Sequence, residues 1–178
     1  MFSLPEPLPK AVMRGNQCFV SGPDADRLHQ QGAVGTMEKG VLRLSDVEML
    51  HLVEREKIAV YGEQGEALDF PSLLKLLEGY DSEIWLKFLL YSDLRRRGYT
   101  VKPGFGPKLE YRVYERGASV GKEPAKYLVY GLVEGKTVKV SEIASISESA
   151  KLSKKDLILA VIDRQGEITY YDTTEVSL

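Results

Sequence analysis

Cysteine and histidine are almost absent from this sequence, which has one cysteine, Cys18, and two histidines, His29 and His51, among 178 residues. A single cysteine excludes an internal disulfide bond. Two isolated histidines with no second cysteine give none of the usual spacings of zinc ligands. We therefore expect neither redox chemistry nor a bound metal.

Long apolar runs and a large net charge are also missing. The longest apolar stretches, such as residues 157–162, fall far short of the roughly 20 residues of a membrane-spanning helix. The N-terminal MFSLPEPLPK lacks the basic-then-apolar pattern of a signal peptide. With 24 Lys and Arg against 26 Asp and Glu, the chain has no overall basic field for nonspecific nucleic-acid binding. We expect a cytoplasmic protein without a membrane partner or a small-molecule cofactor.

The first part of the chain mixes short strands with short helices. Two strand-like pieces flank the turn residue Gly15, and Asp24 or Asp26 is a candidate N-cap for a short helix. Ser45, followed three residues later by Glu48, forms a capping box ahead of an apolar run. These patterns predict an α+β domain of helices and a small antiparallel sheet.

The composition of the sequence changes near residue 81. We place a domain boundary there, which gives domains 1–81 and 82–178. A helix is predicted over residues 82–97, and strands follow in LEYRVYER, AKYLVYGLV, LILAVID and EITYYDTTEV, with one helix near residues 141–151. This predicts a C-terminal mixed sheet flanked by helices. Residues 157–162 are apolar at consecutive positions, which favours a central strand buried on both faces.

General motif rules point to no enzyme. GFGPK at residues 104–108 lacks the ending of a phosphate-binding loop and is interpreted as a turn. His29 and His51 have no Ser, Cys or Asp at a spacing that would indicate a catalytic triad. Arg95, Arg96 and Arg97 suit the negative end of a helix, with an RNA-facing role as the alternative.

The order of motifs in the second half resembles that of the archaeal tRNA-intron splicing endonucleases. The resemblance rests on YRVYERG, KYLV, KKDLILAVID and GEITYYDTTEV, and extends upstream through WLKFLLYSDLRRRGYTVKPGFG and LRLSDVEMLHLVEREKI, so that it covers nearly the whole chain. It implies that the C-terminal domain is a restriction-endonuclease-like nuclease module. It also implies RNA cleavage without metal, with a 2′,3′-cyclic phosphate and a 5′-hydroxyl as products.

The resemblance implies three catalytic positions: a tyrosine acting as base, a histidine donating a proton and a lysine stabilising the transition state. They correspond to Tyr114, Pro124 and Lys155 here. Proline cannot transfer a proton, so the general acid is missing, at an expected cost of roughly 10²- to 10⁴-fold in rate. By local rules alone, Pro124 also suits the start of a strand.

A second departure concerns Glu148, which lies where the family carries an arginine that stacks on an RNA base. A carboxylate there repels phosphate. With two functional positions changed, Tyr114 and Lys155 are candidates for vestigial residues, and packing for the tyrosine and helix capping for the lysine are the competing interpretations.

The resemblance also implies subunit contacts. The EITYYDTTEV strand, with Tyr170 and Tyr171, suits edge-to-edge pairing with a partner strand. The acidic turn with Asp163 and Glu167 corresponds to a loop that inserts into a basic cleft of the opposing dimer. An ordinary sheet strand and a solvated hairpin turn are the alternatives.

We therefore expect the structural, non-catalytic subunit of a tRNA-splicing endonuclease. It would assemble with a catalytic paralogue as an α2β2 heterotetramer that acts on bulge-helix-bulge sites of precursor tRNA. The alternatives are a self-sufficient endonuclease that uses Tyr114 and Lys155, and a fold relative that binds another RNA or protein.

Overall fold

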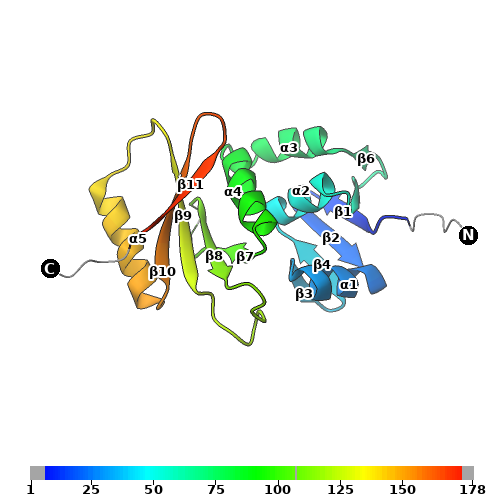
Figure 1. The fold of residues 1–178 in the computed structure, drawn as a ribbon. Coiled ribbons are helices and arrows are strands. Elements are labelled where there is room, and N and C mark those ends of the chain that lie inside the picture. Colours follow the sequence, from blue (N-terminus) through cyan, green and yellow to red (C-terminus); the bar gives the residue numbers. More distant parts are fainter. Residues whose placement is uncertain (1–6, 107, 174–178) are drawn as a thin grey trace, which may run out of the picture. The chain divides into compact units, whose positions relative to one another are not determined.

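The computed structural model describes residues 7–106 and 108–173. The chain divides into two compact units at residues 88 and 89, each with its own sheet (Figure 1). The expected α+β class with two domains is confirmed. The boundary at residues 81 and 82 stays a prediction, because the division at residue 88 falls inside helix α4 (Ile84–Arg96).

The first unit is built on a six-stranded sheet in the order β3-β4-β2-β1-β5-β6. Its strands are β1 (Lys10–Arg14), β2 (Gln17–Ser21), β3 (Thr36–Glu38), β4 (Val41–Leu44), β5 (Ala59–Tyr61) and β6 (Ala67–Leu68). Neighbouring strands are antiparallel except β1 and β5, which are parallel. Alternation along β1 buries Ala11 and Met13 and exposes Lys10, Val12 and Arg14.

Helices α1 (Pro23–Gly32), α2 (Asp46–Glu54) and α3 (Phe70–Glu78) complete this unit. The capping box that starts α2 is confirmed, since the Glu48 carboxylate accepts hydrogen bonds from the backbone N–H and the hydroxyl of Ser45, both at 2.9 Å. The expected N-cap of α1 is wrong. Gly22 precedes the helix and Pro23 begins it, because the fixed φ of proline suits the first helical position.

The second unit contains a five-stranded sheet in the order β11-β10-β9-β8-β7. Its elements are β7 (Thr100–Pro103), β8 (Glu110–Tyr114), β9 (Tyr127–Val133), α5 (Val140–Leu152), β10 (Asp156–Ile162) and β11 (Ile168–Asp172). The parallel neighbours β9 and β10 are joined through α5, and the other pairs are antiparallel. The expectation that residues 157–162 form the central strand is wrong, because β9 occupies the middle and β10 is second from the edge.

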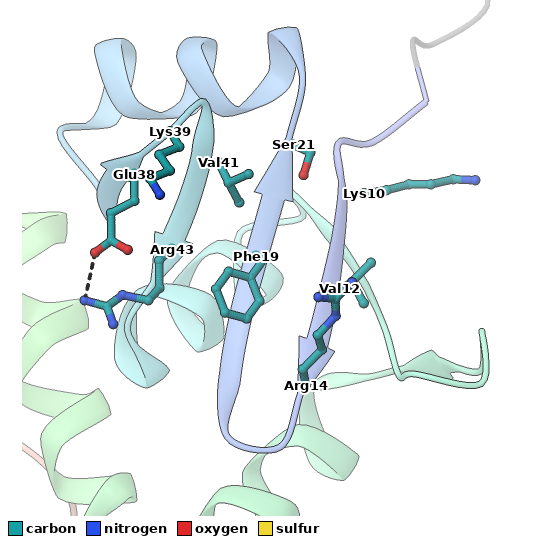
Figure 2. Close-up of a pocket in the computed structure, with 9 residues that line it drawn as sticks. All are labelled: Lys10, Val12, Arg14, Phe19, Ser21, Glu38, Lys39, Val41 and Arg43. Atoms are coloured by element: carbon teal, nitrogen blue, oxygen red, sulfur yellow. Dashed lines mark ion pairs between the residues drawn. The ribbon is translucent and has the colours of Figure 1, made fainter.

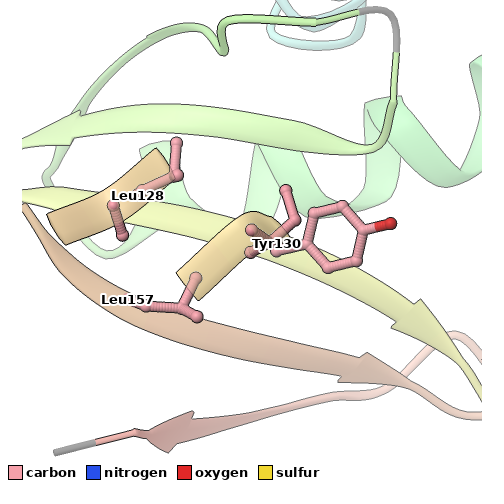
Figure 3. Packing of buried hydrophobic residues seen from close by; sticks show 5 residues of the cluster. Leu128, Tyr130 and Leu157 are labelled. Atoms are coloured by element: carbon pink, nitrogen blue, oxygen red, sulfur yellow. The ribbon is translucent and has the colours of Figure 1, made fainter. Parts of the chain in front are cut away.

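Two helices cover opposite faces of this sheet. On one face, α5 packs Ile146 and Ala150 against Leu128, Tyr130 and Leu157 of β9 and β10 (Figure 3). On the other face, the Tyr91 ring of α4 lies 5.9 Å from that of Tyr111. Gly131 in β9 lets Leu90 and Leu109 approach closely, since a Cβ there would lie 3.3 Å and 2.3 Å from their side chains. The sheet of the second unit therefore packs against α5 on one face and against α4 on the other.

Candidate functional site

The C-terminal end of β8 lies beside the N-terminal ends of β9 and β10, at one edge of the second sheet. Val113 pairs with Tyr127, which in turn pairs with Asp156. The N–H of Lys126 donates to Val113 O at 3.0 Å, and the N–H of Asp156 donates to Lys126 O at 2.9 Å. This row places Tyr114, at the end of β8, and Lys155, just before β10, at the same edge of the sheet.

Tyr114 is buried, with 7% of its surface exposed. A tyrosine in this position is partly a packing residue, as the sequence alone suggested. It is the last residue of β8, a strand in which every residue except Arg112 is buried.

Lys155 follows the end of α5, where the chain turns through Lys154 at a φ of 53°. The Lys155 backbone N–H donates to Ala150 O at 2.9 Å, and its ammonium donates to Ser153 O at 3.0 Å. The ammonium also lies 5.4 Å from the centre of the Phe105 ring. Lys155 therefore helps to end the helix, and its ammonium is held by the neighbouring Ser153 and by Phe105.

Phe105 is a residue of this region that sequence reasoning missed. It is 57% exposed, and Arg112 also lies over its ring, at 5.5 Å. Two cations over one exposed ring form a cation–π cluster. The available signal was a large aromatic residue between two glycines in GFGPK, a stretch interpreted only as a turn.

Pro124 is exposed and lies three residues before β9. It is therefore not the first residue of the strand, contrary to the local expectation. Nearby, Lys126 forms an ion pair with Glu115 at 2.5 Å, and this hydrogen bond raises the pKa of the Lys126 ammonium above its usual value. Pro124 itself brings no ionisable group to the edge.

Glu148 lies on an exposed position of α5, before the turn that leads to Lys155.

Arg97, which directly follows α4, contacts a residue of that helix. The Arg97 guanidinium pairs with Asp93 at 2.7 Å, and this hydrogen bond raises the pKa of Arg97.

The turn between β10 and β11 is organised by its own carboxylate. Asp163 Oδ1 accepts the N–H groups of Gln165 at 2.8 Å and Glu167 at 2.9 Å. The N–H of Arg164 donates to Glu134 at 3.2 Å. Asp163 thus shapes the turn, while the side chain of Glu167 lies in an exposed position.

The two tyrosines of β11 differ in their surroundings. The Tyr170 hydroxyl donates to Asp93 at 2.6 Å and the ring lies 5.0 Å from the Arg97 guanidinium. Burial and the bond to Asp93 raise the pKa of Tyr170 above its ordinary range. Tyr171 is 54% exposed on this edge strand. Thr174, Glu175 and Val176 of the expected strand lie outside the described residues.

In residues 7–106 and 108–173, no group of three or more His, Cys, Asp or Glu side chains is arranged to hold a metal ion. Each helix in the same part of the chain is too short or too polar to span a bilayer.

Comparison with known families defines the class of protein. Residues 84–170 match the tRNA intron endonuclease catalytic C-terminal domain, and residues 10–74 match the tRNA intron endonuclease N-terminal domain. The two matches follow one another in the order of the two units. The chain therefore belongs to the tRNA intron endonuclease family.

Individual relatives agree with this assignment. The chain is 36% identical over 149 residues to a tRNA-splicing endonuclease of Methanothermobacter thermautotrophicus, covering 83% of this chain and 85% of the relative. It is 34% identical over 160 residues to that of Thermococcus gammatolerans, covering 89% and 93%. With that of Methanosarcina acetivorans the identity is 32% over 168 residues, but only 47% of that longer relative is covered, against 94% of this chain.

Proposed function

We propose that this chain is the structural, non-catalytic subunit of a tRNA-splicing endonuclease. It pairs with a catalytic paralogue in an α2β2 heterotetramer and supports the excision of introns from precursor tRNA at bulge-helix-bulge sites. In this proposal the cleavage chemistry belongs to the partner, and this chain supplies the fold and the contact surfaces that order the complex.

The observation that carries the proposal is Pro124. It occupies the position at which the family resemblance requires a histidine, and a proline ring cannot protonate the leaving 5′-oxygen. The two histidines of the sequence, His29 and His51, are more distant in sequence and belong to the first unit. The second unit therefore contains no histidine that could take the place of the missing general acid.

The contacts of Lys155 and the identity of Glu148 support the same conclusion. The Lys155 ammonium is engaged by Ser153 O and by the Phe105 ring, as expected of a lysine that caps a helix. Glu148 places a negative charge on the exposed side of α5, where an RNA phosphate would be repelled.

Two surfaces are available for assembly. The strand β11 forms an edge of its sheet and carries the exposed Tyr171, which suits pairing with a partner strand. The turn of Asp163 and Glu167 presents an exposed carboxylate beside Arg164, and we assign it to the contact with the opposing dimer.

The experiment compares this chain alone, the catalytic paralogue alone, and both together on an intron-bearing precursor tRNA. We expect efficient cleavage, with 2′,3′-cyclic phosphate ends, only when both chains are present. Robust cleavage by this chain alone would overturn the proposal.

Tyr114 and Lys155 provide a matched test within the complex. In this chain, Tyr114→Phe and Lys155→Ala are each expected to change the cleavage rate of the complex by less than about 2-fold. The same replacements in the paralogue should reduce the rate by about 10²-fold or more, because only there do they act with a general acid. Equal losses in both subunits would contradict the assignment.

The second candidate is a self-sufficient endonuclease. The observation in its favour is that Tyr114 and Lys155 lie at the same edge of the sheet, at the ends of the two strands that flank β9. It predicts cleavage by the purified chain and loss of that activity in Tyr114→Phe. A chain that neither cleaves nor copurifies with a homologous subunit would instead be a relative that binds another RNA or protein.

A further inference from the structure

One face of the sheet in the first unit is open and polar. The buried residues of β1, β2 and β4 point to the same side as the apolar residues of the helices, whereas Lys10, Val12 and Arg14 point to the other. A row across this open face follows the register: Tyr61 of β5, Val12, Phe19 of β2, and Arg43 of β4. Figure 2 shows these side chains of β1, β2 and β4 standing on one side of the strands.

The face is hollowed over β1, β2 and β4. The hollow has a volume of about 950 Å³, and Phe19 and Val41 contribute apolar surface to it. Phe19 is half-buried and Val12 is 37% exposed, so apolar atoms remain accessible in the middle of a polar sheet. Such a concave surface with a few charged groups at its margin is typical of a binding site.

The charge around the hollow is strongly positive. Four of its lining residues are basic, namely Lys10, Arg14, Lys39 and Arg43, against one acid, Glu38, which pairs with Arg43 at 3.3 Å. The whole chain, by contrast, carries a net charge of −2. A local excess of positive charge in a slightly acidic protein favours an anionic ligand.

The aromatic rings narrow the class of ligand. Phe19 and Tyr61 lie two strands apart in the same row, and the Lys10 ammonium is 5.7 Å from the centre of the Tyr61 ring. Strands are about 4.8 Å apart, so the two rings are separated by roughly 10 Å across the sheet. Open sheet faces with spaced aromatic rings and flanking cations bind unpaired nucleotides, whose bases stack on the rings while the phosphates meet Lys and Arg.

We propose that this face of the first unit binds a short segment of single-stranded RNA. Phe19 stacks on one base and Tyr61 on a second, while Arg14, Lys39 and Lys10 contact the phosphates. An acidic peptide would use the cations but not the rings, and paired RNA keeps its bases stacked within the duplex, so unpaired RNA fits the combination best. This site is separate from the subunit role proposed above and does not depend on it.

The test uses the full chain and a fluorescein-labelled 12-nucleotide single-stranded RNA of mixed sequence, with binding followed by fluorescence anisotropy. We expect Phe19→Leu, which keeps an apolar side chain, to weaken binding about 10-fold through lost stacking. Arg14→Ala combined with Lys39→Ala should weaken binding by at least about 10-fold and reduce the slope of log Kd against log salt by roughly 1 to 2.

Lys75→Ala is the matched control, because Lys75 is an exposed cation of α3 in the same unit but outside the hollow. It should change the affinity by less than about 2-fold, and circular dichroism checks that each variant is folded. The proposal is overturned if Phe19→Leu binds as well as wild type, if a duplex of the same sequence binds equally, or if polyglutamate competes as effectively as unlabelled RNA.

Discussion

Pro124 differs from the other site positions because its chemistry can be restored by one substitution. The residue is exposed and precedes β9, so a histidine there need not disturb the ladder between β8 and β9. Its side chain would join Tyr114 and Lys155 at the edge where the three strand ends meet.

We expect Pro124→His to restore part of the lost proton transfer. In a complex whose paralogue has lost its own histidine, this variant should raise the cleavage rate by about 10²-fold, the lower end of the usual contribution of a general acid. Cleavage is measured in single-turnover assays on precursor tRNA. Pro124→Ala is the control, and a gain of the same size with alanine would show that removal of the proline ring, and not the imidazole, is responsible.

Cys18 gives a prediction about pH. It is 2% exposed, and burial, with a smaller contribution from the charge of Asp46, raises the pKa of its thiol from 9.0 to about 12. Below pH 9 the thiol is protonated in both folded and unfolded chains and does not affect stability. Between pH 9 and 12 only the unfolded chain loses the proton, so the free energy of unfolding falls as pH rises, by about 1.4 kcal/mol per pH unit from this group.

Urea unfolding between pH 8 and 11 measures this effect as a difference between wild type and Cys18→Ala. Other groups titrate in the same range in both proteins, so their contributions cancel. We expect the free energy of unfolding of the variant to fall less steeply above pH 9. Parallel curves would show that the thiol ionises equally well in the folded chain.

Among the elements, α2 shows how much a local pattern can predict. Ser45 and Glu48 stand at capping-box spacing, and their hydrogen bonds form as expected. The sequence did not reveal that Glu48 Oε1 also accepts the N–H of Gly35 at 2.9 Å, because that contact links residues that are distant in sequence. The N-cap of α1 was missed for a local reason, the preference of Pro23 for the first helical position.

Replacing Glu48 with Ala is expected to lower the free energy of unfolding by about 2–3 kcal/mol. The change removes the helix cap and leaves the buried N–H of Gly35 without the carboxylate that it contacts. Chemical denaturation measures the effect. Glu54→Ala, at an exposed position of the same helix, should change stability by less than about 0.5 kcal/mol, and a comparable loss in both variants would argue against the capping interpretation.

Gly131 tests the packing of β9 between its helices. An alanine Cβ would lie 2.3 Å from Leu109 and 3.3 Å from Leu90, so neighbouring side chains would have to move. We expect Gly131→Ala to destabilise the second unit by about 1–3 kcal/mol, as overpacked cores do.

Gly106→Ala provides the comparison for Gly131→Ala, since its Cβ would meet Glu110 Oε1 at an ordinary 3.5 Å. Thermal and urea unfolding are the measurements. If both variants unfold at the same midpoint, the close approach of Leu90 and Leu109 imposes no constraint.

For the whole molecule, the sequence indicated the class of each half but not the pairing of its strands. The two strand-like pieces that flank Gly15 predicted a local pairing of neighbouring strands. The order of the six-stranded sheet depends instead on β1 pairing with β5, and the open face with Phe19 and Tyr61 exists only because of that pairing. That Tyr114 and Lys155 belong to one site was obtained from the family resemblance, since spacing along the chain does not specify it.

The edge strand β11 gives a prediction for assembly. If it pairs with a partner strand, Tyr171→Glu should weaken the association of this chain with the catalytic paralogue by about 10-fold or more, since it places a charge at a contact that excludes water. Analytical ultracentrifugation of the mixture measures the loss of the α2β2 species. Glu167→Gln at the turn tests the second contact separately. Thr169→Glu, which is exposed on the same side of the strand as Tyr171, should weaken the association in the same direction. Unchanged association in Tyr171→Glu would remove β11 from the interface.

The parallel pairing of β1 with β5 also constrains the order in which the first unit can form. Strands β1 and β2 are joined by a two-residue turn and can pair early, whereas residues 10 and 59 become neighbours only after the whole intervening chain is available. Loop-closure entropy makes such a contact slow to form. During synthesis, one side of β1 therefore waits for its partner strand until the ribosome has released residues 59–61, and in that interval a free strand edge is exposed to other nascent chains.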